Sequence, residues 1–231
     1  MNTRWIRRVL LIVPIIALFL LPILTAQAGT NVLLETFNDN KMDTKLWQTF
    51  SIGSGPTIAE RNRRLEITLP ADCSGDPFFI AYQSRFKMQG NFDIYVDYHL
   101  LTWPEHSGVR VGLGSNLSDP PDAVVERTGH GVSDVADGEE VYLIHTTDSL
   151  LGYIQTTDRS GKLRLYRNGD LVRAYYYDRA ARGWKVIATT NVTTEDVPIL
   201  LAAWSHDWAF ADQNTMIAFD NFTIRLGKMV K

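Results

Sequence analysis

The sequence has a single cysteine, Cys73, in 231 residues. A lone cysteine cannot form an intrachain disulfide. No histidine or lysine lies within several residues of Cys73, and we therefore expect a buried, unreactive thiol. Without disulfides, the fold must be stabilised by its hydrophobic core, with a bound metal ion as the other candidate source of stability.

Positive charge is also scarce. The chain carries 23 Lys and Arg against 26 Asp and Glu, a net charge of −3. Cleavage of an N-terminal leader containing Arg4, Arg7 and Arg8 would leave 20 basic residues and a net charge of −6. Nucleic acid and anionic lipid need a basic field, so this balance argues against both as partners.

Long apolar runs are limited to Val9–Leu24, behind a basic start and ahead of the small-residue sequence Thr25-Ala26-Gln27-Ala28. These three parts predict a secretory signal peptide, residues 1–28, cleaved after Ala28. The alternative is an uncleaved anchor, but the run is shorter than the ~20 residues of a spanning helix. No lipobox cysteine follows. We expect a secreted or extracytoplasmic chain with one domain, residues 29–231, and no stable membrane insertion after cleavage.

Helical periodicity is absent, and the pattern is that of strands and turns. Asn91–Leu101 alternates, with Tyr95, Asp97 and His99 on the polar face. Asn168-Gly169 predicts a type I′ hairpin turn within residues 162–177. Residues 119–138 are predicted to be a long loop, or a loop with a short edge strand. Further strands are predicted at residues 32–37, 64–69, 109–113, 141–145, 151–156, 184–189, 198–204 and 215–225. Many short strands predict a sandwich or a barrel.

Three stretches together resemble the concanavalin A-like lectin/glucanase superfamily. They are Glu35-Thr36-Phe37-Asn38 with Asp43 and Leu46-Trp47, then Arg64–Ile67, then the closing segment Ile217–Ile224. Residues 161–184 are similar to the laminin-G-like branch. The resemblance implies an all-β fold, a two-sheet antiparallel jelly-roll sandwich with one concave sheet. It also implies that the first and last strands are neighbours, with Glu35 and Phe37 near Asp220 and Phe222.

The glucanases of this superfamily carry two glutamates on one strand, in an E-x-D-x-x-E or E-x-D-x-x-x-E pattern. Such a pair suits a retaining nucleophile and acid roughly 5–5.5 Å apart. This sequence lacks the pattern, and the adjacent Glu139 and Glu140 would point to opposite faces of a strand. Metalloprotease, serine hydrolase and phosphate-loop motifs are missing as well. We expect no glucanase mechanism.

The resemblance places a ligand on the concave sheet, where aromatic rings stack on sugar faces and polar groups bind hydroxyls. The predicted ligand-binding residues are Tyr95, Asp97, His99, Trp103, Arg110 and Trp208. The first three and Arg110 are expected to share one face. For His99, His206 and Arg110, a solvated face or a satisfied network is the competing interpretation. Trp103 and Trp208 are expected to be exposed, and Trp47, Trp184 and Trp204 to be core.

The resemblance also implies structural calcium, because the aspartate of the closing strand binds that ion in many members. Asp220 occupies this position, and oxygen donors suit calcium. The alternative is that Asp220 caps a turn or pairs with Arg64. The leading functional prediction is a secreted, lectin-like carbohydrate-binding module whose partner is a glycan or polysaccharide. Two alternatives are a glycoside hydrolase or lyase using Asp97, His99 and Arg110, and a structural or adhesive protein of the cell envelope.

Overall fold

The computed structural model describes residues 32–73, 78–104, 108–115, 123–129, 139–146, 149–205 and 214–231. The predicted signal peptide and Trp208 lie outside these ranges, and the side chain of Cys73 is not described either. Within the described ranges, no helix is both long and apolar enough to cross a membrane.

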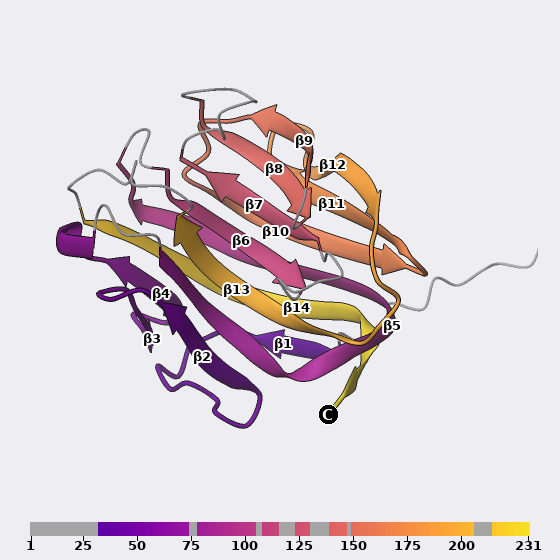
Figure 1. Cartoon of the computed structure of the whole chain (residues 1–231), viewed down its shortest axis with the longest axis horizontal. Helices are drawn as coiled ribbons and strands as arrows, with labels where there is room; N and C mark the ends of the chain where they lie inside the picture. The colour runs from indigo at the N-terminus through magenta and orange to yellow at the C-terminus, as the bar shows by residue number, and fades with distance from the viewer. Residues whose placement is uncertain are drawn as a thin grey trace, which may run out of the picture.

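Antiparallel strands make up most of the described chain, as the alternation predicts (Figure 1). The early strands are β1 (Leu33–Glu35), β2 (Trp47–Ile52), β3 (Thr57–Arg61), β4 (Arg64–Leu69) and β5 (Phe78–Thr102), with a 3-10 turn, η1 (Ala71–Cys73), before β5. The middle strands are β6 (Arg110–Ser115), β7 (Val124–Thr128), β8 (Val141–Thr146) and β9 (Ser149–Gln155). The last are β10 (Ser160–Asn168), β11 (Leu171–Asp178), β12 (Gly183–Asn191), β13 (Val197–Ser205) and β14 (Thr215–Val230).

The long strand β5 belongs to both layers of the molecule. Its first half, up to Met88, pairs with β2 and β13, and its second half, from Phe92, pairs with β10; β14 pairs with β5 from Thr102 back to Lys87, on both sides of this division. Between the halves lies Gly90, with φ +66°, a conformation that costs glycine little. The strand therefore passes from one sheet to the other at Gly90, where its pairing with β14 shifts register.

We call the layers sheet I and sheet II. Sheet I has the order β12-β11-β10-β5-β14-β4-β3, with β1 beside the middle of β14; sheet II has the order β2-β5-β13-β6-β7-β8-β9. Leu33 pairs with Ile224 and Glu35 with Phe222, so the predicted contact of the first and last strands is confirmed.

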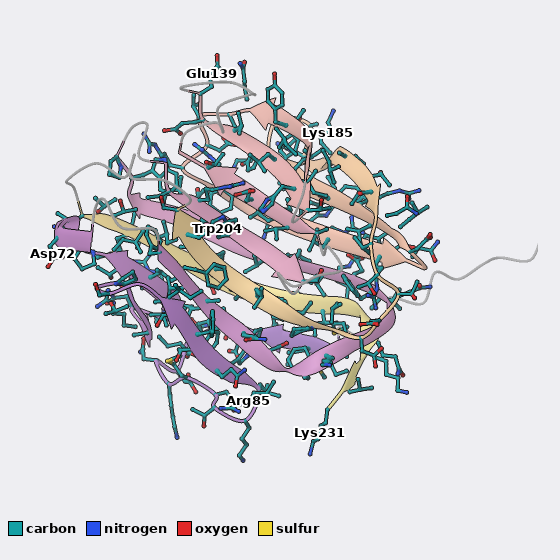
Figure 2. The ribbon with its side chains drawn as sticks, in the orientation of Figure 1. Asp72, Arg85, Glu139, Lys185, Trp204 and Lys231 are labelled. Carbon is teal, nitrogen blue, oxygen red and sulfur yellow. The ribbon has the colours of Figure 1, made fainter. Side chains whose placement is uncertain are left out.

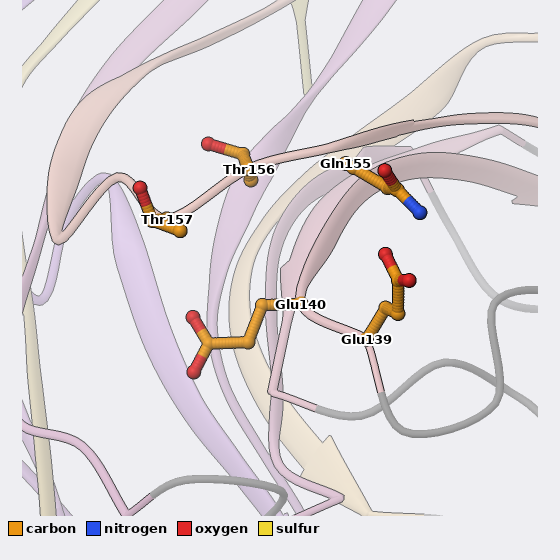
Figure 3. A pocket seen from close by; sticks show the side chains of 5 residues that line it. All are labelled: Glu139, Glu140, Gln155, Thr156 and Thr157. Atoms are coloured by element: carbon orange, nitrogen blue, oxygen red, sulfur yellow. The ribbon is translucent and has the colours of Figure 1, made fainter.

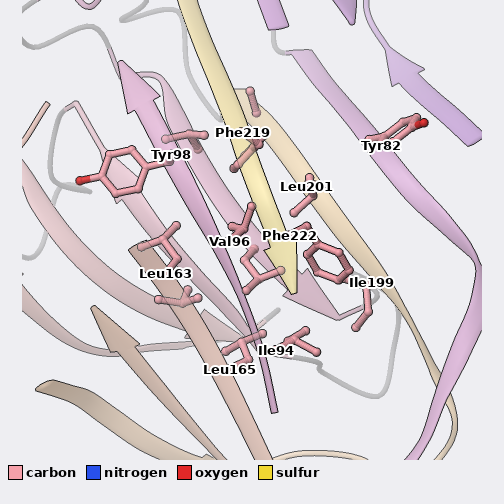
Figure 4. Close-up of a cluster of buried hydrophobic side chains, with 14 of the residues drawn as sticks. Tyr82, Ile94, Val96, Tyr98, Leu163, Leu165, Ile199, Leu201, Phe219 and Phe222 are labelled. Atoms are coloured by element: carbon pink, nitrogen blue, oxygen red, sulfur yellow. The ribbon is translucent and has the colours of Figure 1, made fainter. Parts of the chain in front are cut away.

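Apolar side chains from the two facing surfaces form one core. Ile94, Val96 and Tyr98 of β5 point inward together with Leu163 and Leu165 of β10, and all five are fully buried (Figure 4). From sheet II come Ile199 and Leu201 of β13, and from β14 come Phe219 and Phe222. The hydroxyls of Tyr98 and Tyr142 lie 2.7 Å apart across the layers, so a polar contact crosses the core.

A buried arginine stabilises the bend of β5. The Arg167 guanidinium, 1% exposed, donates hydrogen bonds to the carbonyl oxygens of Gly90 at 2.7 Å, Glu195 at 2.8 Å and Met88 at 3.2 Å. Its Cζ also lies 4.7 Å from the centroid of the Phe92 ring. The Met88 and Gly90 carbonyls flank the point where β5 leaves one sheet for the other, and Glu195 lies in the loop before β13, so Arg167 joins the bend to that loop.

Two sequence predictions of local structure are wrong. Asn168 pairs with Leu171, so the hairpin turn is Gly169-Asp170 rather than Asn168-Gly169. Only Gly169 of these two residues has positive φ, +63°, which is the arrangement of a type II′ turn. In the stretch predicted as a loop or an edge strand, β7 lies inside sheet II between β6 and β8, and all five of its residues are buried.

Candidate functional site

The outer face of sheet I carries a hollow of about 280 Å³ lined by Tyr95, Lys162, Tyr177, Trp184 and Arg225, which we call the aromatic hollow. The residues come from five strands: β5, β10, β11, β12 and β14. Strand pairing explains the grouping. Tyr177 of β11 is paired with Trp184 of β12. Lys162 of β10 is paired with Asp97 of β5, which lies on the same face of β5 as Tyr95. Residues paired in register point to the same side of a sheet.

The Trp184 ring contacts both other aromatic rings of the hollow. The Trp184 ring centroid lies 5.8 Å from that of Tyr95 and 5.5 Å from that of Tyr177, the latter at 84° between planes. The guanidinium carbon of Arg164 lies 5.4 Å from the Trp184 ring centroid. Trp184 is half-buried, so it is not the core residue that the sequence predicted.

Carboxylates hold the cations around the hollow in place. Lys162 Nζ lies 2.5 Å from Asp97 Oδ1 and 5.7 Å from the Tyr95 ring centroid. Arg164 makes a two-point hydrogen bond to Asp93, at 2.6 and 2.9 Å. Arg225 approaches the same carboxylate from the other side, at 3.4 Å. Three cations thus share two carboxylates.

The predicted ligand-binding residues do not share one face. Tyr95, Asp97 and His99 lie on the outer face of sheet I, where they alternate with the core residues of β5. Arg110 belongs to β6 and points away from the core on sheet II. The prediction that these four residues share a face is therefore wrong, because adjacent segments of the chain enter different layers. A hydrolase site combining Asp97, His99 and Arg110 is excluded on the same ground.

His99 lies beside the hollow rather than in it, paired with Ser160 of β10 and Ala218 of β14. Burial lowers the pKa of His99, although the Asp220 and Asp97 carboxylates oppose this. Trp103 was expected to be exposed and is buried, 8% exposed, with Arg127 Cζ 5.8 Å from its ring centroid. That prediction is wrong.

A buried ionic network lies on the outer face of sheet II. Glu126 of β7 accepts two hydrogen bonds of 2.6 Å from Arg110 and lies 2.5 Å from Nδ1 of His145. The Trp204 ring of β13 (Figure 2) covers this network, with its centroid 5.5 Å from Arg110 Cζ and 6.0 Å from the His145 ring. Trp204 is buried as predicted, but it packs with Ala81, Val124, Leu200 and Ala202 in a second cluster outside the main core.

Glu126 is ionised at any ordinary pH. Burial alone raises the pKa of this carboxyl, but the charges and hydrogen bonds of Arg110 and His145 outweigh burial and lower it to about 2. A carboxylate that stays ionised and has both oxygens bonded cannot deliver a proton to a leaving group.

Strand β7 also lacks the second carboxylate of a retaining glycosidase. The residues that it turns outward with Glu126 are Val124 and Thr128. A nucleophile and an acid about 5–5.5 Å apart need two carboxyl groups on such a face. The described part of β7 provides one. This agrees with the sequence, which lacks the paired-glutamate pattern.

A second hollow, of about 460 Å³, lies at the entrance to β8 and is lined by Glu139, Glu140, Gln155, Thr156 and Thr157 (Figure 3). Glu139 points toward Gln155, while Glu140 forms an ion pair with the buried Arg127. The two glutamates precede the strand, so the prediction that they point to opposite faces of one does not apply. Of the two carboxylates, that of Glu140 is therefore paired with a cation.

Asp220 lies at an irregularity of β14, where Asn221 has φ +50°. Its Oδ1 accepts a hydrogen bond of 2.7 Å from the Asn221 backbone N–H. Burial raises the pKa of Asp220, with that hydrogen bond opposing the change. No group of three or more His, Cys, Asp or Glu residues arranged to hold a metal occurs in the described part of the chain. The predicted calcium stays a prediction.

Solved structures place this architecture in the concanavalin A-like lectin/glucanase fold. A LamA variant of Zobellia galactanivorans, crystallised with laminaritriose and laminaritetraose, matches with TM-score 0.60 and 12% identity, covering 85% of this chain and 99% of that chain. SCLam, a non-specific endo-β-1,3(4)-glucanase of family GH16, matches with TM-score 0.61 and 13% identity, covering 87% and 92%. An immunostimulatory antigen and pseudo-β-1,3-glucanase of Mycobacterium tuberculosis matches with TM-score 0.59 and 13% identity, covering 87% and 100%.

Residues 25–226 match a family model described as the C domain of a protein of unknown function, DUF1583. The chain belongs to this family. A comparison with curated protein sequences finds no match.

Proposed function

We propose that this chain is a non-catalytic carbohydrate-binding module that receives a sugar ring in the aromatic hollow. The carrying observation is the hollow itself, in which Tyr95, Tyr177 and Trp184 lie beside polar and charged groups on an exposed sheet face. Aromatic rings offer flat apolar surface to the C–H face of a pyranose, and neighbouring donors and acceptors satisfy its hydroxyls. The glucanase fold of the laminarioligosaccharide-bound LamA supports glycan as the ligand class.

Two features favour binding over turnover. The one described carboxylate that points outward from β7 is neutralised by Arg110, and the carboxylates beside the hollow, Asp93 and Asp97, are each paired with a cation. Charge pairs of this kind keep carboxylates ionised and occupied, whereas an acid catalyst needs a raised pKa. The signal-peptide prediction adds that the module acts outside the cytoplasm, where polysaccharides are accessible.

A structural or adhesive role without a small ligand is the second candidate. The observation in its favour is the outer face of sheet II, where Leu200, Ala202 and Trp204 are buried. In that case the aromatic hollow would bind no saccharide.

Isothermal titration of a saccharide panel against the full chain and the variant Trp184→Ala tests the proposal. We expect binding that weakens by about 5- to 150-fold in Trp184→Ala, because stacking on an aromatic ring contributes about 1–3 kcal/mol by analogy with base stacking. Phe50→Ala removes an aromatic side chain of sheet II that is more exposed than Trp184 and lies outside the hollow, and it should leave binding unchanged. Absence of binding across the panel, or unchanged binding by Trp184→Ala, would refute the proposal.

A further inference from the structure

The aromatic hollow has an excess of positive charge that a neutral sugar does not need. Lys162, Arg164 and Arg225 surround it, against the carboxylates of Asp93 and Asp97. Asp220, the cross-strand partner of Asp97, is a third nearby carboxylate. The lining of the hollow itself, however, has two cations, Lys162 and Arg225, and no carboxylate, in a chain whose net charge is −3. A local surplus of the sign opposite to that of the whole chain indicates an anionic ligand.

Arg225 is the cation best placed to supply this charge. Its side chain is 49% exposed, and its 3.4 Å approach to Asp93 is looser than the two hydrogen bonds of 2.6 and 2.9 Å that Arg164 makes to the same carboxylate. Since Arg164 already satisfies Asp93, Arg225 can turn its guanidinium toward a ligand at little cost. A guanidinium fork matches a carboxylate or sulfate with two parallel hydrogen bonds.

Lys162 is the second contributor. Its Nζ bonds Asp97 at 2.5 Å, while Asp97 also accepts a hydrogen bond of 3.2 Å from the Asn221 side chain. Asp97 thus keeps a partner if Lys162 moves toward a ligand. Lys162 and Arg225 both line the hollow, along with Tyr95, Tyr177 and Trp184. An anionic group and an apolar ring face are therefore accommodated in the same cavity.

We infer that the aromatic hollow binds an anionic sugar residue, a uronate or a sulfated pyranose, with the ring against Trp184 and the charged group between Lys162 and Arg225. This rests on the proposed function and specifies its ligand class. The volume of about 280 Å³ lies at the small end of ligand sites, which suits one sugar residue of a longer chain.

The test compares three oligosaccharides of equal length by isothermal titration against the full chain: one neutral, one made of uronic acid and one sulfated. We expect at least one anionic ligand to bind ten times more tightly than the neutral one, with the preference shrinking as salt rises. The stronger of the two anionic ligands identifies the source of the charge.

Arg225→Gln and Lys162→Gln should each remove most of the preference for the anionic ligand while leaving weak binding of the neutral one. Arg173→Gln is the matched control, because Arg173 is an exposed cation of β11 that does not line the hollow. Equal affinity for neutral and anionic ligands overturns this inference and leaves the proposed function standing. Binding that is lost in Arg173→Gln as strongly as in Arg225→Gln also overturns it, and absence of binding by any saccharide overturns both.

Discussion

Glu126 and Arg110 form a fully buried, two-point ion pair on the outer face of sheet II, with both hydrogen bonds at 2.6 Å. The pair lies outside the main core, so the core does not shield it from solvent. The Trp204 ring packs over it instead, and His145 contacts the Glu126 carboxylate as a third member. A buried pair with both members satisfied adds little stability relative to an apolar pair of similar volume, but the loss of one member is costly.

Glu126→Gln is therefore expected to lower the free energy of unfolding by about 3–5 kcal/mol at pH 7, because Arg110 is left buried with a neutral partner. Urea unfolding measures this. Glu139→Gln, an exposed site, should change stability by less than about 0.5 kcal/mol. The pKa of Glu126 is lowered to about 2, so the pair stabilises the fold above the ordinary carboxyl pKa of 4.5 and this stability is lost as the pH falls through 2. The gap between wild type and Glu126→Gln should close over that range; a gap independent of pH contradicts the argument.

Glu60 is expected to behave in the opposite way. It is 7% exposed, its Oε1 accepts a 3.3 Å hydrogen bond from Tyr82, and its Oε2 has no partner in the described structure. Burial and the nearby Glu35 raise its pKa to about 7. Its protonated form is therefore favoured by folding, which adds stability below pH 4.5 that is lost as pH rises through 7.

Glu60→Gln should consequently stabilise the protein by about 1–3 kcal/mol at pH 8 and have little effect at pH 5. Thermal melts at the two pH values measure the difference, with Glu195→Gln, an exposed site, as the control. Equal effects of Glu60→Gln at both pH values would show that Glu60 does not titrate in this range.

Arg167→Met should destabilise the fold by about 3–5 kcal/mol, because three carbonyl oxygens, two of them at the bend of β5, lose their charged donor. Arg173→Met changes an exposed arginine of the neighbouring strand and should cost less than 1 kcal/mol. Hydrogen exchange adds a local readout: amides around Gly90 should exchange faster in Arg167→Met. Unchanged exchange there, with an intact melting temperature, counts against a structural role for Arg167.

Calcium at Asp220 is tested by melting the full chain with calcium chloride and with a chelator. Free calcium at 100 times its dissociation constant would raise stability by about 2.7 kcal/mol. Asp220→Asn should remove that response, while Asp170→Asn, in an exposed turn, should retain it. A melting temperature that calcium leaves unchanged disproves the calcium prediction.

The predicted signal peptide implies a defined N-terminus for the mature protein, produced by cleavage after Ala28. Mass spectrometry of the protein recovered outside the cytoplasm should give a chain that begins at Gly29. Recovery of the intact chain, beginning at Met1 and bound to membranes, would favour the anchor.

The fold was more predictable from the sequence than the site. Alternation in residues 91–101 identifies which side chains of a strand share a face, and that prediction is confirmed for Tyr95, Asp97 and His99. Alternation does not reveal which sheet a strand joins. Arg110 lies only eleven positions after His99 yet belongs to the other layer, because its partners are β13 and β7, which come later in the chain.

The residues that were missed had weak or misleading signals. Both faces of β7 are buried, so Glu126 stands in a strand without the usual contrast between apolar and polar positions, inside a stretch rich in turn residues. Trp184 was assigned to the core because large aromatics usually are buried. Its pairing with Tyr177 places it on the outer face of sheet I, where it is half-buried. The local sequence does not predict that pairing.

The position of β14 has a consequence for the timing of folding. This last strand lies between β4 and β5 in sheet I and pairs with β1 near its middle, so the sheet cannot close until residues 215–230 have been synthesised. Pairing between distant parts of a chain is slow, because loop closure must precede the contacts that reward it. The predicted leader would therefore be available to an export machinery while the chain behind it is still unfolded and its closing strand is still missing.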